Sequence, residues 1–172
     1  GATLLAPGLV RHGGAGESTI APWQAGGIAA ERAAEVAALL SAAGLPTTTT
    51  SDPQALLWSK LAVNCAINPL TAILRVPNGA LLQIPDARAM LMAAAREVGQ
   101  VAERLEVRLP ADPVQRALAV AEATAANRSS MLQDVLTGRR TEIDAISGAV
   151  AARAETLGIP APVNTMLCRL VR

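Results

Sequence analysis

Aromatic side chains are almost missing from this sequence. Among its 172 residues there is no Phe or Tyr, and Trp occurs twice. With so few aromatic rings and a net charge of +1, the chain has neither the stacking platform nor the basic surface typical of nucleic-acid-binding proteins. Its apolar stretches are interrupted before they reach about 18 residues, and its first residues do not resemble a signal peptide. We therefore expect no nucleic-acid partner and no membrane partner.

Cysteine is also scarce. Cys65 and Cys168 are far apart and lack the spacing of metal ligands. Disulfide scaffolds and zinc modules are thereby disfavoured, and the expected location is the cytoplasm. No metal site is expected. The Walker, HExxH, CxxC and GxSxG motifs are absent, and His12, in a glycine-rich stretch, is interpreted as an ordinary loop residue.

Small aliphatic residues dominate what is present. Hydrophobic residues make up 51% of the chain, charged residues 17%, and 37 residues are Ala. This composition predicts a folded core of Ala, Leu, Val and Ile. In the first fifty residues, strands are expected at 3–6 and 18–21, joined as a hairpin or through a loop, followed by a helix at 25–43 and a strand at 47–50. So small an α/β piece packs poorly alone, so we expect the chain to begin partway through a larger domain.

From residue 51 onward the pattern is helical. Asp52-Pro53 is typical of a helix start, and a kink or break is expected at Asn68-Pro69. Further helices are expected over 86–107, 113–126, from 129 or 130 to 138, 141–157 and 162–172. The predicted fold class is mainly α, a helical bundle preceded by a short α/β segment.

The lysine content points to a candidate site. Fourteen of the 15 basic residues are Arg, and Lys60 is the only lysine. Lys60, Asn64 and Asn68 are spaced i, i+4, i+8, which places them on one face of a helix. Asn is a poor helix-interior residue, so this polar row on an apolar helix indicates a polar cleft. The alternative is a solvated helix face with Lys at its end.

Three further candidates have simple structural explanations. Asn78 lies in a Pro-Asn-Gly turn, where Asn is common for conformational reasons. Ser129 or Ser130 is expected to cap a helix. Glu142, near the start of the helix expected at 141–157, suits the positive end of that helix and is equally compatible with a catalytic role.

Three blocks of sequence resemble one family. The blocks are WSKLAVNCAINPLTAILRVPNG at 58–79, SSMLQD at 129–134 with TEID at 141–144, and GIPAPVN at 158–164. In this order and spacing they resemble the signatures of the ketopantoate reductase family, over essentially the whole chain. The resemblance implies a helical domain like the C-terminal domain of 6-phosphogluconate dehydrogenase. Residues 1–50 would be the end of an NADP-binding Rossmann domain that is otherwise missing, and residues 51–172 the helical substrate-binding domain.

The resemblance also implies roles for individual residues. Lys60 matches the general acid that protonates the developing alkoxide. Asn64, Asn68 and Asn78 match residues that bind the substrate, and Ser130 matches the serine that binds its carboxylate. Glu142 matches an acid near the substrate hydroxyls and the nicotinamide end of the cofactor. An ammonium can both stabilise an alkoxide and release a proton, which Arg cannot readily do.

The expected function is therefore reduction of 2-dehydropantoate to pantoate with NADPH, in the biosynthesis of pantothenate and coenzyme A. The family's GxGxxG turn does not occur in this chain, so we expect the chain alone to be inactive. One alternative is a paralogous reductase for another 2-keto acid. Another is a non-catalytic helical module for dimerisation or ligand binding. Ala-rich helix faces would also suit a homodimer.

Overall fold

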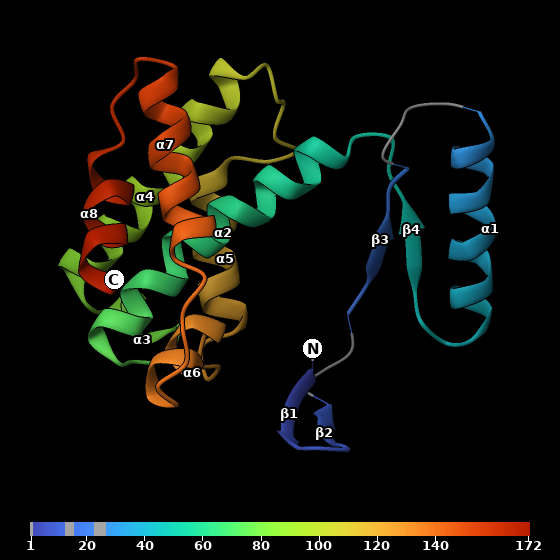
Figure 1. Cartoon of the computed structure of the whole chain (residues 1–172), viewed down its shortest axis with the longest axis horizontal. Helices are drawn as coiled ribbons and strands as arrows, with labels where there is room; N and C mark the ends of the chain where they lie inside the picture. Colours follow the sequence, from blue (N-terminus) through green and yellow to red (C-terminus); the bar gives the residue numbers. More distant parts are fainter. Residues whose placement is uncertain (1, 13–15, 23–26) are drawn as a thin grey trace. The chain divides into compact units, whose positions relative to one another are not determined.

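The computed structural model describes residues 2–12, 16–22 and 27–172. It divides into two compact units, residues 1–53 and 54–172, and each is described by itself (Figure 1). The first unit contains, in chain order, β1 (Ala2–Ala6), β2 (Leu9–His12), β3 (Ser18–Ile20), α1 (Ile28–Ala42) and β4 (Thr47–Thr49). Its helix begins three residues later than expected, with residues 25 and 26 outside the described part.

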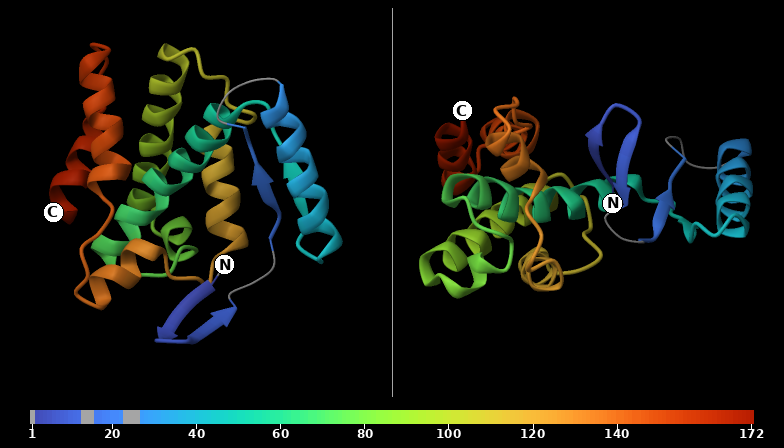
Figure 2. Two further views of the ribbon diagram at one scale, coloured as in Figure 1. Left: turned by 45° about the vertical axis from the view of Figure 1, so that its right-hand side comes forward. Right: turned by 90° about the horizontal axis from the view of Figure 1, so that it is seen from below.

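Two separate pairs of strands form in the first unit. β1 and β2 make an antiparallel hairpin, visible in Figure 2. The turn between them is Pro7-Gly8, and Gly8 has φ +78°, a conformation that favours glycine. Pairing of the strands at 3–6 and 18–21 is therefore wrong, because this turn folds the chain back earlier. The glycines at 13 and 14 lie outside the described residues.

The second pair is parallel. β3 pairs with β4, with Ser18 opposite Thr47 and Ile20 opposite Thr49. Parallel neighbours need a crossover connection, and α1 lies between the two strands in sequence. The result is a small β–α–β unit.

The second unit is helical. It contains α2 (Pro53–Leu74), α3 (Ala80–Gln83), α4 (Pro85–Arg104), α5 (Pro113–Ala123), α6 (Ser130–Leu136), η1 (Asp144–Gly148), α7 (Ala149–Thr156) and α8 (Pro162–Val171). The mainly helical fold class is thus confirmed. Asp112 is the N-cap of α5, since its Oδ1 accepts a hydrogen bond from the Gln115 N–H at 2.8 Å. None of the helices in the described part of the chain is long and apolar enough to cross a membrane.

Helix α2 continues past its proline. Pro69 lies inside α2, which ends only at Leu74, so of the kink or break expected there, the break does not occur. A proline in a helix interior costs about 3 kcal/mol or more. Residues 65–72 of α2 are all buried, and the packing of this stretch outweighs that cost.

The helix expected over 141–157 is composite. It starts with η1, a π-helical turn, and continues as α7. Gly148 lies at the junction, where an added Cβ would be 3.2 Å from the Cys168 Sγ. Glu142 precedes η1, and its carbonyl accepts hydrogen bonds from the N–H groups of Ala145 and Ile146, both at 3.0 Å.

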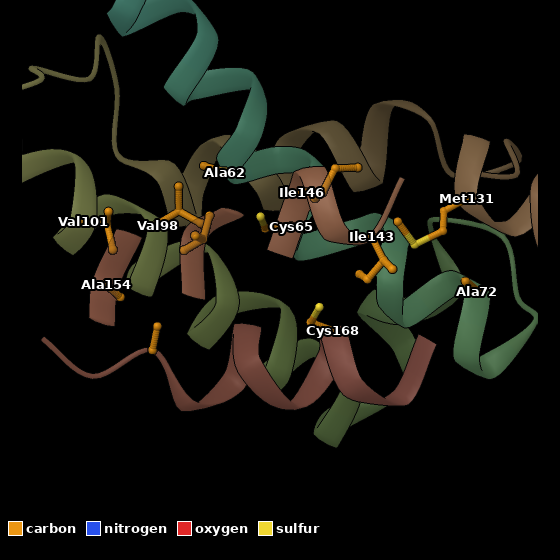
Figure 3. Close-up of a cluster of buried hydrophobic side chains, with 12 residues drawn as sticks. Ala62, Cys65, Ala72, Val98, Val101, Met131, Ile143, Ile146, Ala154 and Cys168 are labelled. Carbon is orange, nitrogen blue, oxygen red and sulfur yellow. The ribbon is translucent and has the colours of Figure 1, made fainter. Parts of the chain in front are cut away.

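The core of the helical unit is built from small side chains on α2, α4 and their neighbours. One cluster joins α2 and α4 to η1, α7 and α8, and includes Cys65, Val98 and Ile146 (Figure 3). A second cluster joins α2 and α4 to α3 and α5, and includes Leu91 and Ala117. Because α2 belongs to both clusters, its polar residues are held on a well-packed helix.

Candidate active site

The polar row on α2 becomes more buried along the helix. Lys60, Asn64 and Asn68 all lie in α2, so they fall within about 80° of one helix face. Lys60 is exposed, Asn64 is half-buried, and Asn68 is only 7% exposed. The row therefore leads from solvent into the helical unit, with the ammonium at its open end.

A pair of hydroxyls connects the inner end of this row to α6. The Thr71 Oγ1 lies 2.7 Å from the Ser129 Oγ. Thr71 Oγ1 also lies 2.9 Å from the carbonyl oxygen of Asn68. Ser129 is the N-cap of α6, because its Oγ accepts a hydrogen bond from the Leu132 N–H at 3.0 Å. Ser129 is thus the capping serine that the sequence left undecided, and the exposed Ser130 is the first residue of α6.

The turn that carries Asn78 is fastened to the segment between α5 and α6. The Asn78 N–H donates to the Asn127 carbonyl at 3.0 Å, and Nδ2 donates to the Thr124 Oγ1 at 2.9 Å. Asn78 Oδ1 is enclosed and has no hydrogen-bond partner among the described residues. Gly79 allows the close approach, because an added Cβ would lie 2.5 Å from the Ala125 Cβ.

Described contacts connect some of the six candidate residues and leave others apart. Asn68 is joined to the Ser129–Ser130 segment through Thr71. Within the described part of the chain, the side chains of Lys60, Ser130 and Glu142 form no hydrogen bond or ion pair with another residue. These three side chains are exposed, so they are free to contact a ligand.

Cys65 adds no reactive group at neutral pH. Burial raises the pKa of the Cys65 thiol to about 12, and the nearby charge of Glu97 acts in the same direction. A thiol is nucleophilic only as its thiolate. Cys65, next to Asn64 on α2, is therefore an inert core residue. The described residues contain no group of three or more His, Cys, Asp or Glu side chains that could hold a metal ion.

Thr71 and Glu97 make hydrogen bonds that the sequence did not predict. Nothing in the sequence around Thr71 sets it apart from other residues of α2, and its contact with Ser129 is visible only in the structure. Glu97 is 7% exposed, and its carboxylate accepts hydrogen bonds from the N–H groups of Val163 and Asn164 at 2.8 and 2.9 Å. It thereby caps α8. The available signal was an acidic residue, Glu97, in a stretch of α4 that is otherwise apolar except for Arg96.

A large pocket of the helical unit lies away from the candidate residues. It has a volume of about 1220 Å³ and lies between α4, α5 and the segment joining them, lined by residues such as Arg96, Glu103 and Arg108. None of the six candidates lines it. A smaller pocket of about 270 Å³ includes Thr141 and Ile143, on either side of Glu142. The six candidate residues thus line neither of these two pockets.

The chemistry available from the six candidate side chains is narrow. They offer one ammonium, one carboxylate, amide groups and a hydroxyl. Such groups can orient a small polar anion and supply a proton, but they include no activated nucleophile. A reaction here would need its electrons from another molecule.

Comparison with known proteins gives a consistent picture. Residues 52–172 match the family profile described as "Ketopantoate reductase PanE/ApbA C terminal". The 2-dehydropantoate 2-reductase of Halobacterium salinarum is 44% identical over 172 residues, which is 100% of this chain and 56% of that protein. The Vibrio cholerae enzyme of the same name is 40% identical over 164 residues, 95% of this chain and 54% of that protein. The chain thus spans about half the length of these relatives.

Solved structures extend the comparison. The ketopantoate reductase of Ralstonia eutropha superposes with a TM-score of 0.88 at 37% identity, covering 100% of this chain and 55% of that one. A D-mandelate dehydrogenase, solved with NADH and anilino(oxo)acetate, has a TM-score of 0.87 at 28% identity, covering 99% of this chain and 56% of that one. Both similarities include the first unit as well as the helices.

Proposed function

Because the chain belongs to the ketopantoate reductase family, we propose that the protein containing it reduces 2-dehydropantoate to pantoate with NADPH. This reaction is a step towards pantothenate and coenzyme A. The observation that carries the proposal is the row of Lys60, Asn64 and Asn68 on one face of α2, inside the region that matches the family. The names of the curated relatives support the same substrate.

We further propose that residues 1–50 belong to an NADP-binding Rossmann domain and that residues 51–172 form the substrate domain. The parallel β3–α1–β4 unit supports this assignment, because doubly wound dinucleotide-binding sheets are built from such units. Apolar side chains of this unit are also uncovered, among them Ile28 at 69% and Leu39 at 71% exposure. More chain packed on them would bury this surface.

Lys60 is the proposed proton donor. Its ammonium, at the solvent end of the row, would lie against the keto oxygen, stabilise the negative charge that develops there, and then protonate it. The nicotinamide of the cofactor supplies the hydride when it is bound. Arg in place of Lys60 would keep the charge but would not readily release a proton.

The neutral side chains are proposed to orient the substrate. Asn64 and Asn68 donate and accept hydrogen bonds without adding charge, and Ser130 binds the carboxylate. Asn78 contributes Oδ1 as an acceptor, because its Nδ2 already donates a hydrogen bond to the Thr124 Oγ1 while Oδ1 has no partner among the described residues. A substrate hydroxyl that reaches Oδ1 would satisfy an otherwise unpaired buried acceptor, which is costly to leave empty.

Glu142 is proposed to lie near the substrate hydroxyls and the nicotinamide end of the cofactor. It is the one candidate of this chain that we assign to both molecules. Its exposed carboxylate lies just before η1 and has no intramolecular partner in the described part of the chain. It can therefore accept a hydrogen bond from a ligand hydroxyl.

A second 2-keto acid is a specific alternative. The D-mandelate dehydrogenase that shares this fold at 28% identity was solved with NADH, so a related scaffold uses another substrate and another nicotinamide cofactor. If the protein is such a paralogous reductase, kcat/KM should be higher for phenylglyoxylate, the keto acid corresponding to mandelate, than for 2-dehydropantoate.

The test is a substrate and cofactor comparison with the full-length protein. The oxidation of NADPH and of NADH is followed with 2-dehydropantoate, with 3,3-dimethyl-2-oxobutanoate, which lacks the hydroxyl, and with phenylglyoxylate. We expect kcat/KM for 2-dehydropantoate with NADPH to exceed the others by about a hundredfold or more, because a site built to bind a hydroxyl rejects analogues without it. A higher kcat/KM for phenylglyoxylate would establish the paralogue, and oxidation with none of the three would refute both.

Location and partners are proposed on the same basis. Cys65 and Cys168 are both free buried thiols, as expected for a protein of the reducing cytoplasm. The proposed partner is a small 2-keto acid, with no nucleic acid or membrane. A homodimer remains our expectation, supported by Met166 and Leu170, which lie one turn apart on α8 and are 55% and 62% exposed. Sedimentation velocity tests it.

A further inference from the structure

Two buried hydroxyls form a contact that the proposed reaction does not itself require. Thr71 is fully buried and Ser129 is 7% exposed. They are 58 residues apart in sequence, yet their Oγ atoms lie 2.7 Å apart. Neither residue is among the groups proposed to touch the substrate or the cofactor, so their contact needs a separate explanation.

One arrangement of the hydroxyl protons links all of these contacts in a single direction. The carbonyl oxygens of Ile67 and Asn68, 3.0 and 2.9 Å from the Thr71 Oγ1, can only accept. When the hydroxyl of Thr71 donates its proton to these carbonyls of α2, the hydroxyl of Ser129 donates to Thr71. Ser129 in turn accepts from the Leu132 N–H. The result is a continuous chain of donors from Leu132 through Ser129 and Thr71 to the backbone of Asn68.

This chain of hydrogen bonds spans two elements that each carry a proposed substrate contact. At one end it reaches the carbonyl of Asn68, 2.9 Å from the Thr71 Oγ1 on the next turn of α2. At the other end it fixes the first turn of α6, which begins with Ser130. Hydrogen bonds that run in one direction polarise and strengthen one another in a buried environment.

We propose that Thr71 and Ser129 are positioning residues that set the distance between Asn68 and Ser130 for a 2-keto acid. This inference rests on the proposed function, since those two residues are its substrate contacts. Without the chain of hydrogen bonds, the start of α6 moves relative to α2. The substrate can then no longer bind Asn68 and, through its carboxylate, Ser130 at the same time.

The predicted effect is specific to substrate binding. Thr71→Val keeps the shape of the side chain but removes the donor. In the full-length protein we expect the KM for the keto acid to rise about tenfold, the effect of one lost neutral hydrogen bond. The Kd for NADPH should stay within about twofold of wild type, because only the substrate contacts are disturbed. Thr71→Ser restores the hydroxyl and should restore the KM.

Coupling between the two positions gives a second measure. Ser129→Ala should raise the KM by a similar factor, and the double variant Thr71→Val/Ser129→Ala should raise it no more than either change alone. Val114→Ala, which shortens a core side chain of α5 away from these hydroxyls, is the matched control. It should lower the melting temperature comparably and leave the KM unchanged.

Amide hydrogen exchange at Leu132 reports on the contact without any catalysis. Faster exchange at Leu132 in Thr71→Val, with wild-type exchange in Thr71→Ser and Val114→Ala, is the expected result. If wild type reduces no keto acid, the proposed function fails while this exchange pattern still decides whether the contact orders α6. If wild type is active and Thr71→Val keeps both the wild-type KM and wild-type exchange, or if Val114→Ala raises the KM equally, the positioning role is refuted.

Discussion

Cys65 illustrates how burial alone determines the chemistry of a residue. It adjoins Asn64 in the proposed site, yet it is completely buried, and desolvation of the thiolate is the main reason that its pKa is raised to about 12. Its burial agrees with its place in an apolar stretch of α2. The gradation in exposure from Lys60 to Asn68 was not predictable, since it depends on which neighbouring helices cover each turn.

The raised pKa of Cys65 predicts a loss of stability at alkaline pH. The folded protein holds the thiol proton more tightly than the unfolded chain, whose thiol has the ordinary value of 9.0. The stabilisation is therefore complete below about pH 9 and is lost as the pH rises from 9 towards 12. Urea unfolding of wild type and Cys65→Ala should show the difference between their free energies of unfolding shrinking or reversing above pH 9. A constant difference over that range would contradict the assignment.

At the scale of elements, the contact between the 77–79 turn and the segment after α5 is the tightest near the site. Gly79→Ala would place its Cβ 2.5 Å from the Ala125 Cβ and 2.8 Å from the Ala125 Cα. Because backbone must move to relieve this, we expect a loss of about 1–3 kcal/mol in the free energy of unfolding.

Chemical denaturation measures the effect, and Ala125→Gly in the same chain should recover part of the loss. Gly138→Ala is a useful comparison. An added Cβ there meets nothing within 4 Å, but Gly138 has φ +68°, so any loss comes from backbone strain alone. If Gly79→Ala is as stable as wild type, the turn and the segment after α5 are not in this close contact.

Local rules predicted most helix boundaries, and tertiary packing accounts for the exceptions. Asp112 and Ser129 are the N-caps of α5 and α6, and Asp and Ser are residue types favoured at that position. The unbroken course of α2 through Pro69 depends on the burial of residues 65–72, and the π-helical turn at Asp144–Gly148 packs close to Cys168. Neither environment can be read from the local sequence. The contact between Thr71 and Ser129 was not predictable either, because these residues are 58 positions apart in the sequence.

At the scale of the whole molecule, the exposed apolar surface of the first unit is the main feature. Leu4 and Val10 of the hairpin are 61% and 59% exposed, and a sheet of two strands is marginal by itself. Such a surface is expected where more chain packs. The sequence predicted an α/β segment of this kind, but it assigned the wrong strand partners, because it placed the turn in the glycine-rich stretch instead of at Pro7-Gly8.

The isolated 172-residue chain should therefore bind NADPH weakly and reduce no keto acid, because the GxGxxG turn that holds a pyrophosphate is not in its sequence. Isothermal titration calorimetry with NADPH, alongside the full-length protein as control, measures this. Equal affinity in both would show that the described residues bind the cofactor without further chain.

The central claim is that the polar row on α2 is where the keto acid is reduced, with Lys60 as its proton donor. The most direct measurement is the turnover of Lys60→Ala and Lys60→Arg in the full-length protein, together with the Kd for NADPH from its fluorescence. We predict that kcat falls by about a hundredfold or more in both variants, the usual contribution of a general acid, while the Kd stays near that of wild type. Wild-type turnover in Lys60→Ala would contradict the account and return Lys60 to an ordinary solvated position on α2.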